Sequence, residues 1–190
     1  KEDMWISRIP VPVEINASAH ADDDFSKFGS IAELTNWNIY SPVWAPVSLE
    51  GAWLKLQDKD PFDYAKVERK IPASKELKVS FDLLAEQNDK GRLQIDFLDG
   101  NSIACSRLEL TPDGIFRMKG GSRFANMMNY EAGKTYHVEA VLSTADRNIQ
   151  VYVDGKRVGL RMFYAPVATI ERIAFRTGEM RTFPTVDTPA

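Results

Sequence analysis

Four aromatic residues early in the chain are the side chains best suited to contact a sugar; they are Trp37, Tyr40, Trp44 and Trp53. Sugars present apolar C–H faces rimmed by hydroxyl groups, and flat rings with nearby polar side chains can contact both. Trp37 has a polar asparagine on each side, which suits a binding platform. Trp37, Tyr40 and Trp44 are therefore candidate ligand-binding residues. The alternative is that these rings fill a protein core, as tryptophans often do.

A second group of polar residues alternates with apolar ones further along the chain. It consists of Gln94, Asp96, Arg107, Glu109, His137 and Glu139. If the strands that carry these residues share one concave sheet, the side chains form a polar groove suited to an oligosaccharide. We take Gln94, Asp96, Arg107, Glu109 and His137 as further candidate ligand-binding residues.

Catalytic interpretations of this polar group are weaker. It is faintly similar to the active surface of alginate-lyase jelly rolls, but Asp96 stands where a Gln-Ile-His motif would carry histidine. A glycosidase needs two carboxylates at a defined separation on one face, which Asp96 and Glu109 could supply. Sandwich strands carry such residues routinely, and the Glu-x-Asp-x-x-Glu pattern of jelly-roll glucanases does not occur. We therefore assign no catalytic residue.

Three carboxylates in one short segment, Asp58, Asp60 and Asp63, form a candidate metal site. Alternating acidic residues in a loop can supply several oxygen ligands to Ca²⁺. Lys59 reduces the local negative charge, and a solvated structural turn is the alternative. Calcium is the one cofactor that the sequence suggests.

Two arginines and a tyrosine outside these groups could contact an acidic glycan; they are Arg123, Tyr130 and Arg176. Arginine suits bidentate recognition of a carboxylate. The alternative for each is an ordinary surface contact such as a salt bridge.

The elements that must position these residues have a period of two. Apolar residues alternate with polar ones over residues 53–57, 78–83, 92–97, 136–142, 149–153 and 172–176. This alternation indicates strands with one buried and one wet face. Turn signals separate them at residues 99–101, 112–114 and 154–156. We expect an all-β fold, a two-sheet antiparallel jelly-roll sandwich of the concanavalin A-like type.

Composition and net charge limit the kinds of molecule that the chain is suited to bind. The chain of 190 residues carries 24 basic and 27 acidic residues, and its net charge is −3 without a basic block. This charge distribution disfavours nucleic acid and anionic membrane surfaces as partners. The single cysteine, Cys105, excludes an internal disulfide and favours a small buried side chain.

Proline-rich stretches at both ends suggest that the domain comes from a longer chain. We expect a connector or edge strand over residues 1–16, a sandwich domain over 17–180 and a tail over 181–190.

Three segments together resemble one known family: residues 5–12 (WISRIPVP), 56–65 (LQDKDPFDYA) and 170–178 (IERIAFRTG). They look like the jelly-roll domain that follows a sialidase-like (BNR-repeat) β-propeller in secreted proteins of gut Bacteroidetes. The strand order also resembles laminin G-like sandwiches. The resemblance rests on structural motifs and transfers no functional residue.

This resemblance implies a non-catalytic accessory domain of an exported, glycan-degrading protein, extracellular or periplasmic. Its expected partners are an oligo- or polysaccharide and a neighbouring catalytic domain, which could be a glycoside hydrolase. A purely structural interdomain module is the main alternative, and a polysaccharide lyase or glycoside hydrolase is a weaker one.

Overall fold

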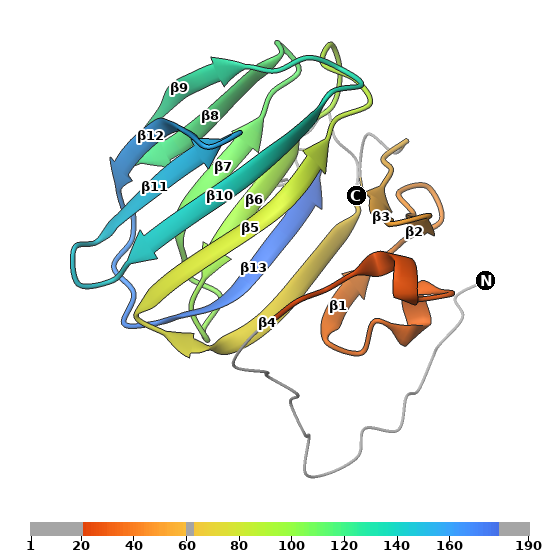
Figure 1. Ribbon diagram of the computed structural model, residues 1–190, viewed down its shortest axis with the longest axis horizontal. Helices are drawn as coiled ribbons and strands as arrows, with labels where there is room; N and C mark the ends of the chain where they lie inside the picture. The colour runs from red at the N-terminus through yellow and green to blue at the C-terminus, as the bar shows by residue number, and fades with distance from the viewer. Residues whose placement is uncertain (1–20, 60–62, 179–190) are drawn as a thin grey trace, which may run out of the picture.

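The computed structural model describes residues 21–59 and 63–178, and these residues form a β-sandwich (Figure 1). Thirteen strands are present in them, together with two single 3₁₀ turns, η1 (Phe25–Lys27) and η2 (Ile31–Glu33). The strands are β1 (Trp37–Tyr40), β2 (Val47–Glu50), β3 (Trp53–Leu56), β4 (Lys66–Ser74), β5 (Glu76–Leu84), β6 (Leu93–Leu98), β7 (Ala104–Leu110), β8 (Ile115–Gly120), β9 (Arg123–Asn129), β10 (Thr135–Ser143), β11 (Asn148–Val153), β12 (Lys156–Met162) and β13 (Ile170–Thr177).

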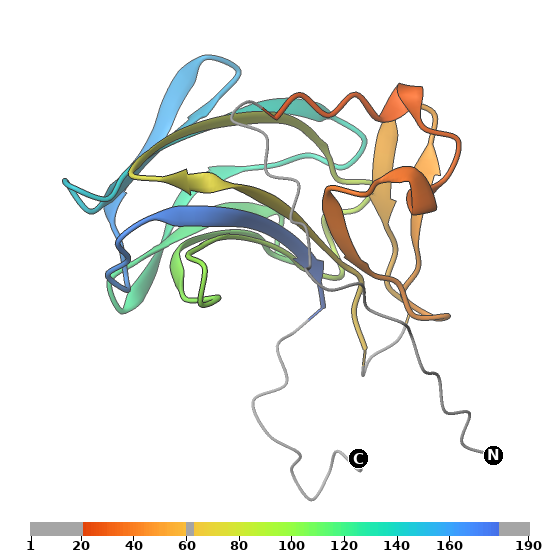
Figure 2. The ribbon, with the colours of Figure 1, turned by 90° about the horizontal axis from the view of Figure 1, so that it is seen from below.

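Two large antiparallel sheets make up the layers of the sandwich. The seven-stranded sheet has the order β1-β4-β13-β6-β7-β8-β9, and the four-stranded sheet has the order β12-β11-β10-β5. The strands of both sheets bow in the same direction, so the outward face of the seven-stranded sheet is concave (Figure 2). The fold is the expected all-β, jelly-roll-like sandwich.

The main core lies between these two sheets and follows the period-two pattern of the sequence. The inward-facing side chains of the central strands are fully buried, among them Ile95, Phe97, Leu108, Val138, Leu142, Ile149 and Val151. Burying each large aliphatic side chain stabilises the fold by about 1.5–3 kcal/mol. The alternation therefore fixes which side of each strand faces out and is available for binding.

Cys105 also belongs to this core and is completely buried. Burial in apolar surroundings raises the pKa of its thiol to about 12. The thiol is therefore a packing group, as expected from its strand context.

A separate two-stranded hairpin, β2–β3, stands beside β1 at one end of the sandwich (Figure 1). A second, smaller core joins it to the larger sheet through Ala45, Val47, Ala65 and Val67.

The turns have the conformations that their residues favour. Asp154 and Gly155 connect β11 to β12 with φ values of 50° and 76°, which is the backbone of a type I′ hairpin turn. The turn signals at residues 99–101 and 112–114 likewise fall between strands.

The expected connector at 1–16 and tail at 181–190 lie outside the described residues. In the described ranges, no helix has the length and apolar character needed to cross a bilayer.

Candidate functional site

The outward face of the seven-stranded sheet carries two rows of side chains that cross all seven strands. In an antiparallel sheet, directly paired residues point to the same face. The pairings give one row of Tyr40, Lys66, Arg176, Gln94, Glu109, Arg117 and Asn126, and a second of Asn38, Glu68, Ala174, Asp96, Arg107, Lys119 and Phe124. We call these fourteen residues the polar face. At about 4.8 Å between strands, each row is roughly 29 Å long.

Glu109 is the most buried charge of the polar face, with 1% of its surface exposed. Arg117 Nε donates to Glu109 Oε1 at 2.9 Å, and Arg92 Nη1 lies 3.6 Å from the same oxygen. Gln94 Nε2 donates to the other carboxylate oxygen at 3.4 Å. A buried carboxylate needs such partners, because its desolvation is costly. Glu109 therefore holds two guanidinium groups in fixed positions at the centre of the face.

Two other carboxylates organise the second row. Arg107 donates from Nε and Nη2 to the two oxygens of Asp96, at 2.6 and 2.8 Å. This bidentate pair raises the pKa of Arg107, since the adjacent negative charge stabilises the guanidinium. Glu68 accepts from Lys66 Nζ at 2.8 Å and from Arg172 Nη1 at 3.4 Å. These two carboxylates are thus held by cations rather than poised as an acid and a base.

One end of the polar face, at β1 and β4, carries two tyrosines whose tilted rings contact each other. The rings of Tyr40 and Tyr64 are 5.1 Å apart, and the Arg176 guanidinium lies 3.8 Å from the Tyr64 ring centre. Tyr40 donates from its hydroxyl to Asp63 at 3.1 Å, which raises the pKa of Tyr40. Tyr40 is 46% exposed, so its ring is accessible to a ligand.

Aromatic rings also lie under cations near the opposite end of the face. Arg117 and Lys119 each lie 4.3 Å from a ring centre, that of Phe124 and that of Tyr164 respectively. Burial raises the pKa of Tyr164 to about 12, so its hydroxyl stays protonated. The alternation of rings and cations offers both apolar contact and hydrogen bonding to one ligand.

One atom at the centre of the polar face has an unused hydrogen-bonding capacity. Gln94 is 4% exposed, and its Oε1 is buried without a hydrogen-bond partner among the described residues. Buried polar atoms are nearly always paired with protein, water or a ligand. Gln94 Oε1 is therefore an unpaired acceptor beneath the surface of the polar face.

The structure separates the four aromatic residues of the early cluster. Trp37 faces the second core, with ring contacts of 5.6 Å to Phe25 and 6.4 Å to Phe175. The packing interpretation therefore describes Trp37, which is partly buried against the second core. Trp44 is 66% exposed, and its backbone accepts from Lys59 near the Tyr40 end of the polar face.

Trp53 is exposed by 37% at the tip of the β2–β3 hairpin, where it pairs with Glu50. It therefore lies at the opposite end of the hairpin from the segment that carries Trp44.

His137 and Glu139 do not share a face with the other candidate polar residues. They lie on β10 in the four-stranded sheet, opposite Asp82 and Ser80 of β5. His137 Nδ1 is 2.7 Å from Asp82 Oδ1 in an exposed pair. The expectation of one shared groove is wrong for these two residues, because alternation fixes the face within a strand but not the sheet to which the strand belongs.

Several other predicted contacts have structural roles. Tyr130 is buried and donates to the Thr111 carbonyl at 2.8 Å, so it is unavailable to a glycan. Asp63 accepts from Tyr40 and from the Tyr64 backbone N–H at 2.9 Å. Asp60 lies outside the described residues, so the calcium prediction stays a prediction. Within the described ranges, no acidic, histidine or cysteine cluster has metal-site geometry.

Sequence reasoning missed Tyr64, Arg117, Phe124, Lys119 and Tyr164 as members or neighbours of the polar face. The outward position of Arg117 and Lys119 follows from the alternation in β8, and that signal was available. Tyr64 and Tyr164 precede and follow strands, and only the three-dimensional fold brings them to this surface.

Comparison with known proteins agrees with this architecture. A family model described as "Sialidase-like, CBM domain" matches residues 37–190. A solved structure named "Sialidase" is 96% identical over 96% of this chain, with a TM-score of 0.89, and this chain spans 17% of its length. No curated protein is significantly similar to the chain.

Two more distant structures share the fold alone. The Crh5 transglycosylase in its apo form has a TM-score of 0.67 at 11% identity, covering 85% of this chain and 70% of its own. The Emp47p carbohydrate recognition domain has a TM-score of 0.53 at 12% identity, covering 81% of this chain and 83% of its own.

Proposed function

Because this chain belongs to the sialidase-like CBM domain family, whose members are accessory carbohydrate-binding modules, we propose that it binds an oligo- or polysaccharide on its polar face. The observation that carries this proposal is the continuous polar row from the exposed Tyr40 to the exposed Asn126. The row is long enough for several sugar units, and its side chains are fixed in advance by ion pairs. Little conformational entropy would then be lost on binding.

The chemistry of the polar face suits sugars in two respects. Tyr40 offers an accessible ring for a C–H face, and fixed guanidinium, carboxylate and amide groups offer donors and acceptors for hydroxyls. By contrast, the outward face of the four-stranded sheet carries fewer aromatic residues and an exposed His137–Asp82 pair.

We also propose the setting in which the domain works. The similarity to a much longer sialidase supports a role as one module of an exported glycan-processing protein, acting beside a catalytic domain. The domain would then hold that catalytic domain near its polymeric substrate, which raises the effective concentration of the substrate.

Calorimetric titration of the domain with a panel of host and plant oligosaccharides tests the binding proposal. For a glycan that binds, Tyr40→Ala should weaken affinity about tenfold, corresponding to roughly 1.4 kcal/mol for loss of an aromatic platform. Tyr152→Ala is the matched control, because Tyr152 faces outward on the four-stranded sheet. Equal losses in the two variants, or no binding of any glycan, would contradict the proposal.

A second candidate role rests on the loop between β1 and β2. Val43 and Trp44 are 83% and 66% exposed, an apolar pair of the kind that marks a contact with another domain. Trp44→Ala in the isolated domain separates the two roles. A weaker glycan affinity assigns Trp44 to the binding face, whereas an unchanged affinity assigns this loop to the neighbouring domain.

A further inference from the structure

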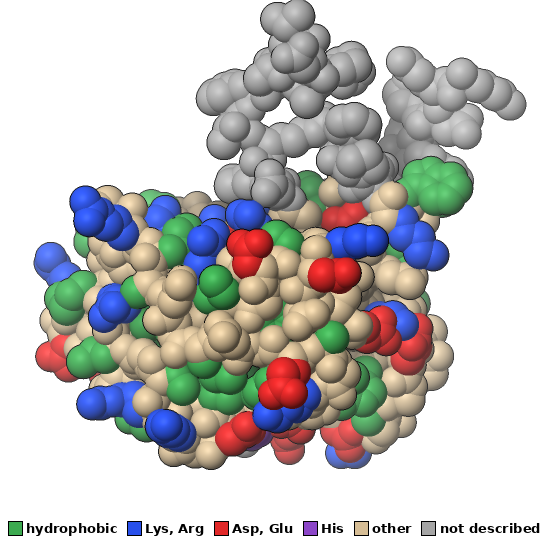
Figure 3. All heavy atoms as spheres, turned by 90° about the horizontal axis from the view of Figure 1, so that it is seen from above, with side chains coloured by type: hydrophobic (Ala, Val, Ile, Leu, Met, Phe, Trp, Pro, Cys, Tyr) green, Lys and Arg blue, Asp and Glu red, His purple; other side chains and the backbone are tan. Residues whose placement is uncertain are grey.

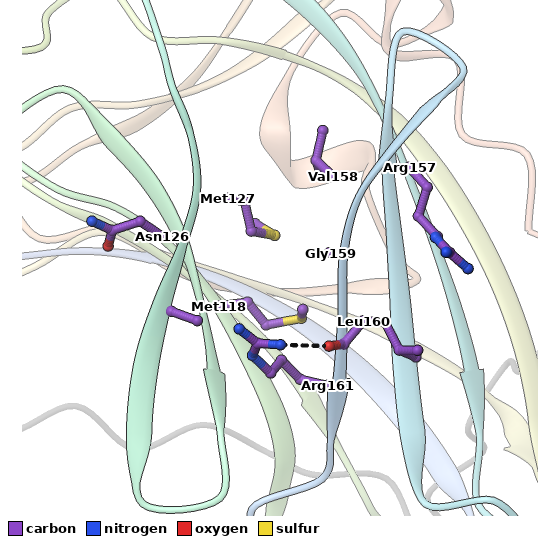
Figure 4. Close-up of a pocket in the computed structure, with 9 residues that line it drawn as sticks. Met118, Asn126, Met127, Arg157, Val158, Gly159, Leu160 and Arg161 are labelled. Atoms are coloured by element: carbon purple, nitrogen blue, oxygen red, sulfur yellow. Dashed lines mark hydrogen bonds between the residues drawn. The ribbon is translucent and has the colours of Figure 1, made fainter.

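The open edges of the two sheets lie side by side at the end of the sandwich opposite β1. Within the described residues, β9 is the last strand of the seven-stranded sheet and β12 is the last strand of the four-stranded sheet. A cleft of about 370 Å³ lies between them. Figure 4 shows Met118 and Met127 between the two edges, while Asn126 and Arg157 point away from the cleft.

The floor of this cleft is shaped by a glycine. A side chain at Gly159 would meet Met118 Cε and Met127 Sδ at 2.8 Å each. Glycine therefore lets the two methionines lie against the β12 backbone. Met118 is buried, so the partly exposed Met127 is the methionine that offers a soft apolar surface to the C–H face of a sugar.

Two arginines, Arg123 and Arg161, lie close together at the edge of the cleft, and we call this pair the basic corner. Arg123 lies directly opposite Gly120 in the β8–β9 register. The stem of Arg161 lies where a Gly120 side chain would be, since a Cβ there would be 2.8 Å from Arg161 Cβ. Both arginines therefore leave the backbone beside Gly120, on the side of the sheet opposite to Lys119 and the rest of the polar face.

No carboxylate of the described residues is within ion-pair distance of either arginine. Arg161 donates to its neighbouring backbone carbonyl, that of Leu160, at 3.0 Å (Figure 4). By contrast, the cations Arg107 and Arg117 of the polar face are paired with Asp96 and Glu109. In Figure 3 Lys and Arg predominate at the left end of the molecule, the end at which Figure 1 places β9 and β12.

Unpaired cations held close together repel one another, and an anion between them removes that repulsion. The chain as a whole carries a net charge of −3, so a basic corner is not a consequence of its composition. Guanidinium groups also bind carboxylate and sulfate oxygens in bidentate geometry.

We propose that the basic corner and the adjoining cleft bind an acidic unit of the glycan, with its carboxylate or sulfate held by Arg123 and Arg161. This inference rests on the proposed function, since the glycan on the polar face would reach the corner at Asn126. The two parts are separable, because the polar face alone would bind neutral and acidic glycans equally well.

Matched pairs of glycans test the proposal in calorimetric titrations at low and moderate salt. A hyaluronan hexasaccharide is compared with its carboxyl-reduced, neutral form, and 3′-sialyllactose is compared with lactose. Chondroitin hexasaccharide with and without 4-sulfate then distinguishes sulfate from carboxylate. We expect at least one acidic glycan to bind about tenfold more tightly than its neutral or unsulfated partner, because charge-assisted hydrogen bonds contribute about 1.5–3 kcal/mol each. Rising NaCl should reduce that preference.

Substitutions test which residues are responsible for the preference for acidic glycans. Arg123→Gln with Arg161→Gln should make the two members of a pair bind equally, whereas Lys75→Gln, which removes an exposed cation from the β4–β5 turn, should not. Equal affinity of the natural chain for both members overturns this inference but not the proposed function. A preference that survives the double substitution also overturns it. Failure of every glycan to bind overturns both.

Discussion

At the scale of single residues, the account depends on carboxylates that hold cations in place on an otherwise exposed face. Glu109 is the clearest case, because it is almost completely buried and contacts Arg117, Arg92 and Gln94. Removing its charge would leave guanidinium groups without their counter-ion. The cost would be smaller than for a fully buried ion pair, since the Arg117 side chain remains 27% exposed.

Glu109→Gln should therefore lower the free energy of unfolding by about 2 kcal/mol, as measured by urea denaturation. The control is Asp82→Asn, which removes the charge of the exposed His137–Asp82 pair and should cost less than about 1 kcal/mol. A Glu109→Gln protein as stable as the Asp82→Asn protein would show that the polar face is not organised around Glu109.

At the scale of elements, the close packing of β12 against β8 and β9 depends on two glycines, Gly120 and Gly159. The atoms that surround these two glycines differ. A methyl group at Gly120 would meet the stem of Arg161, which is fixed to the β12 backbone. A methyl group at Gly159 would meet only the flexible ends of two methionine side chains. The first contact can be relieved only by moving a strand, and the second by a rotation of side chains.

We expect Gly120→Ala to cost about 2–3 kcal/mol of stability and Gly159→Ala about 1 kcal/mol or less, compared by thermal and urea unfolding. The Gly159→Ala protein should also bind the acidic glycan less tightly, because displaced methionines occupy the cleft. Equal stability costs would indicate that β12 does not pack closely against β8.

The elements themselves were largely predictable from the sequence, whereas their assignment to sheets was not. Alternation in residues 78–83 and 92–97 predicts which side chains are inside, because one face of each strand must be buried. It does not reveal that β10 pairs with β5 or that β6 pairs with β13, since those partners are distant in sequence. His137 was therefore grouped with Gln94 although the two residues lie on different sheets.

The aromatic cluster illustrates the same limit. Trp37 has polar neighbours on both sides, yet it packs in the second core because η1 and β13 place Phe25 and Phe175 against it. Tyr64 and Tyr164 reach the polar face only through the ends of strands and loops. Local sequence patterns do not indicate whether a segment that is distant in the sequence will cover an aromatic ring or leave it exposed.

At the scale of the whole molecule, the two sheets have different roles. The four-stranded sheet covers the main core, and the concave seven-stranded sheet carries the organised polar face (Figure 2). The Tyr40 end of that face is aromatic and the Asn126 end adjoins the basic corner. This polarity would fix the direction of a bound glycan, with its acidic unit at β9.

Chemical-shift mapping tests the central claim most directly, because it reports where a ligand lies without a prior choice of residue. The ¹⁵N-labelled domain would be titrated with the tightest-binding glycan from the calorimetric panel. The account predicts that the perturbed backbone amides lie along β4, β13, β6, β7 and β8, with side-chain amide shifts at Gln94 and Asn126. Perturbations confined to β5, β10 and β11 of the four-stranded sheet would contradict it.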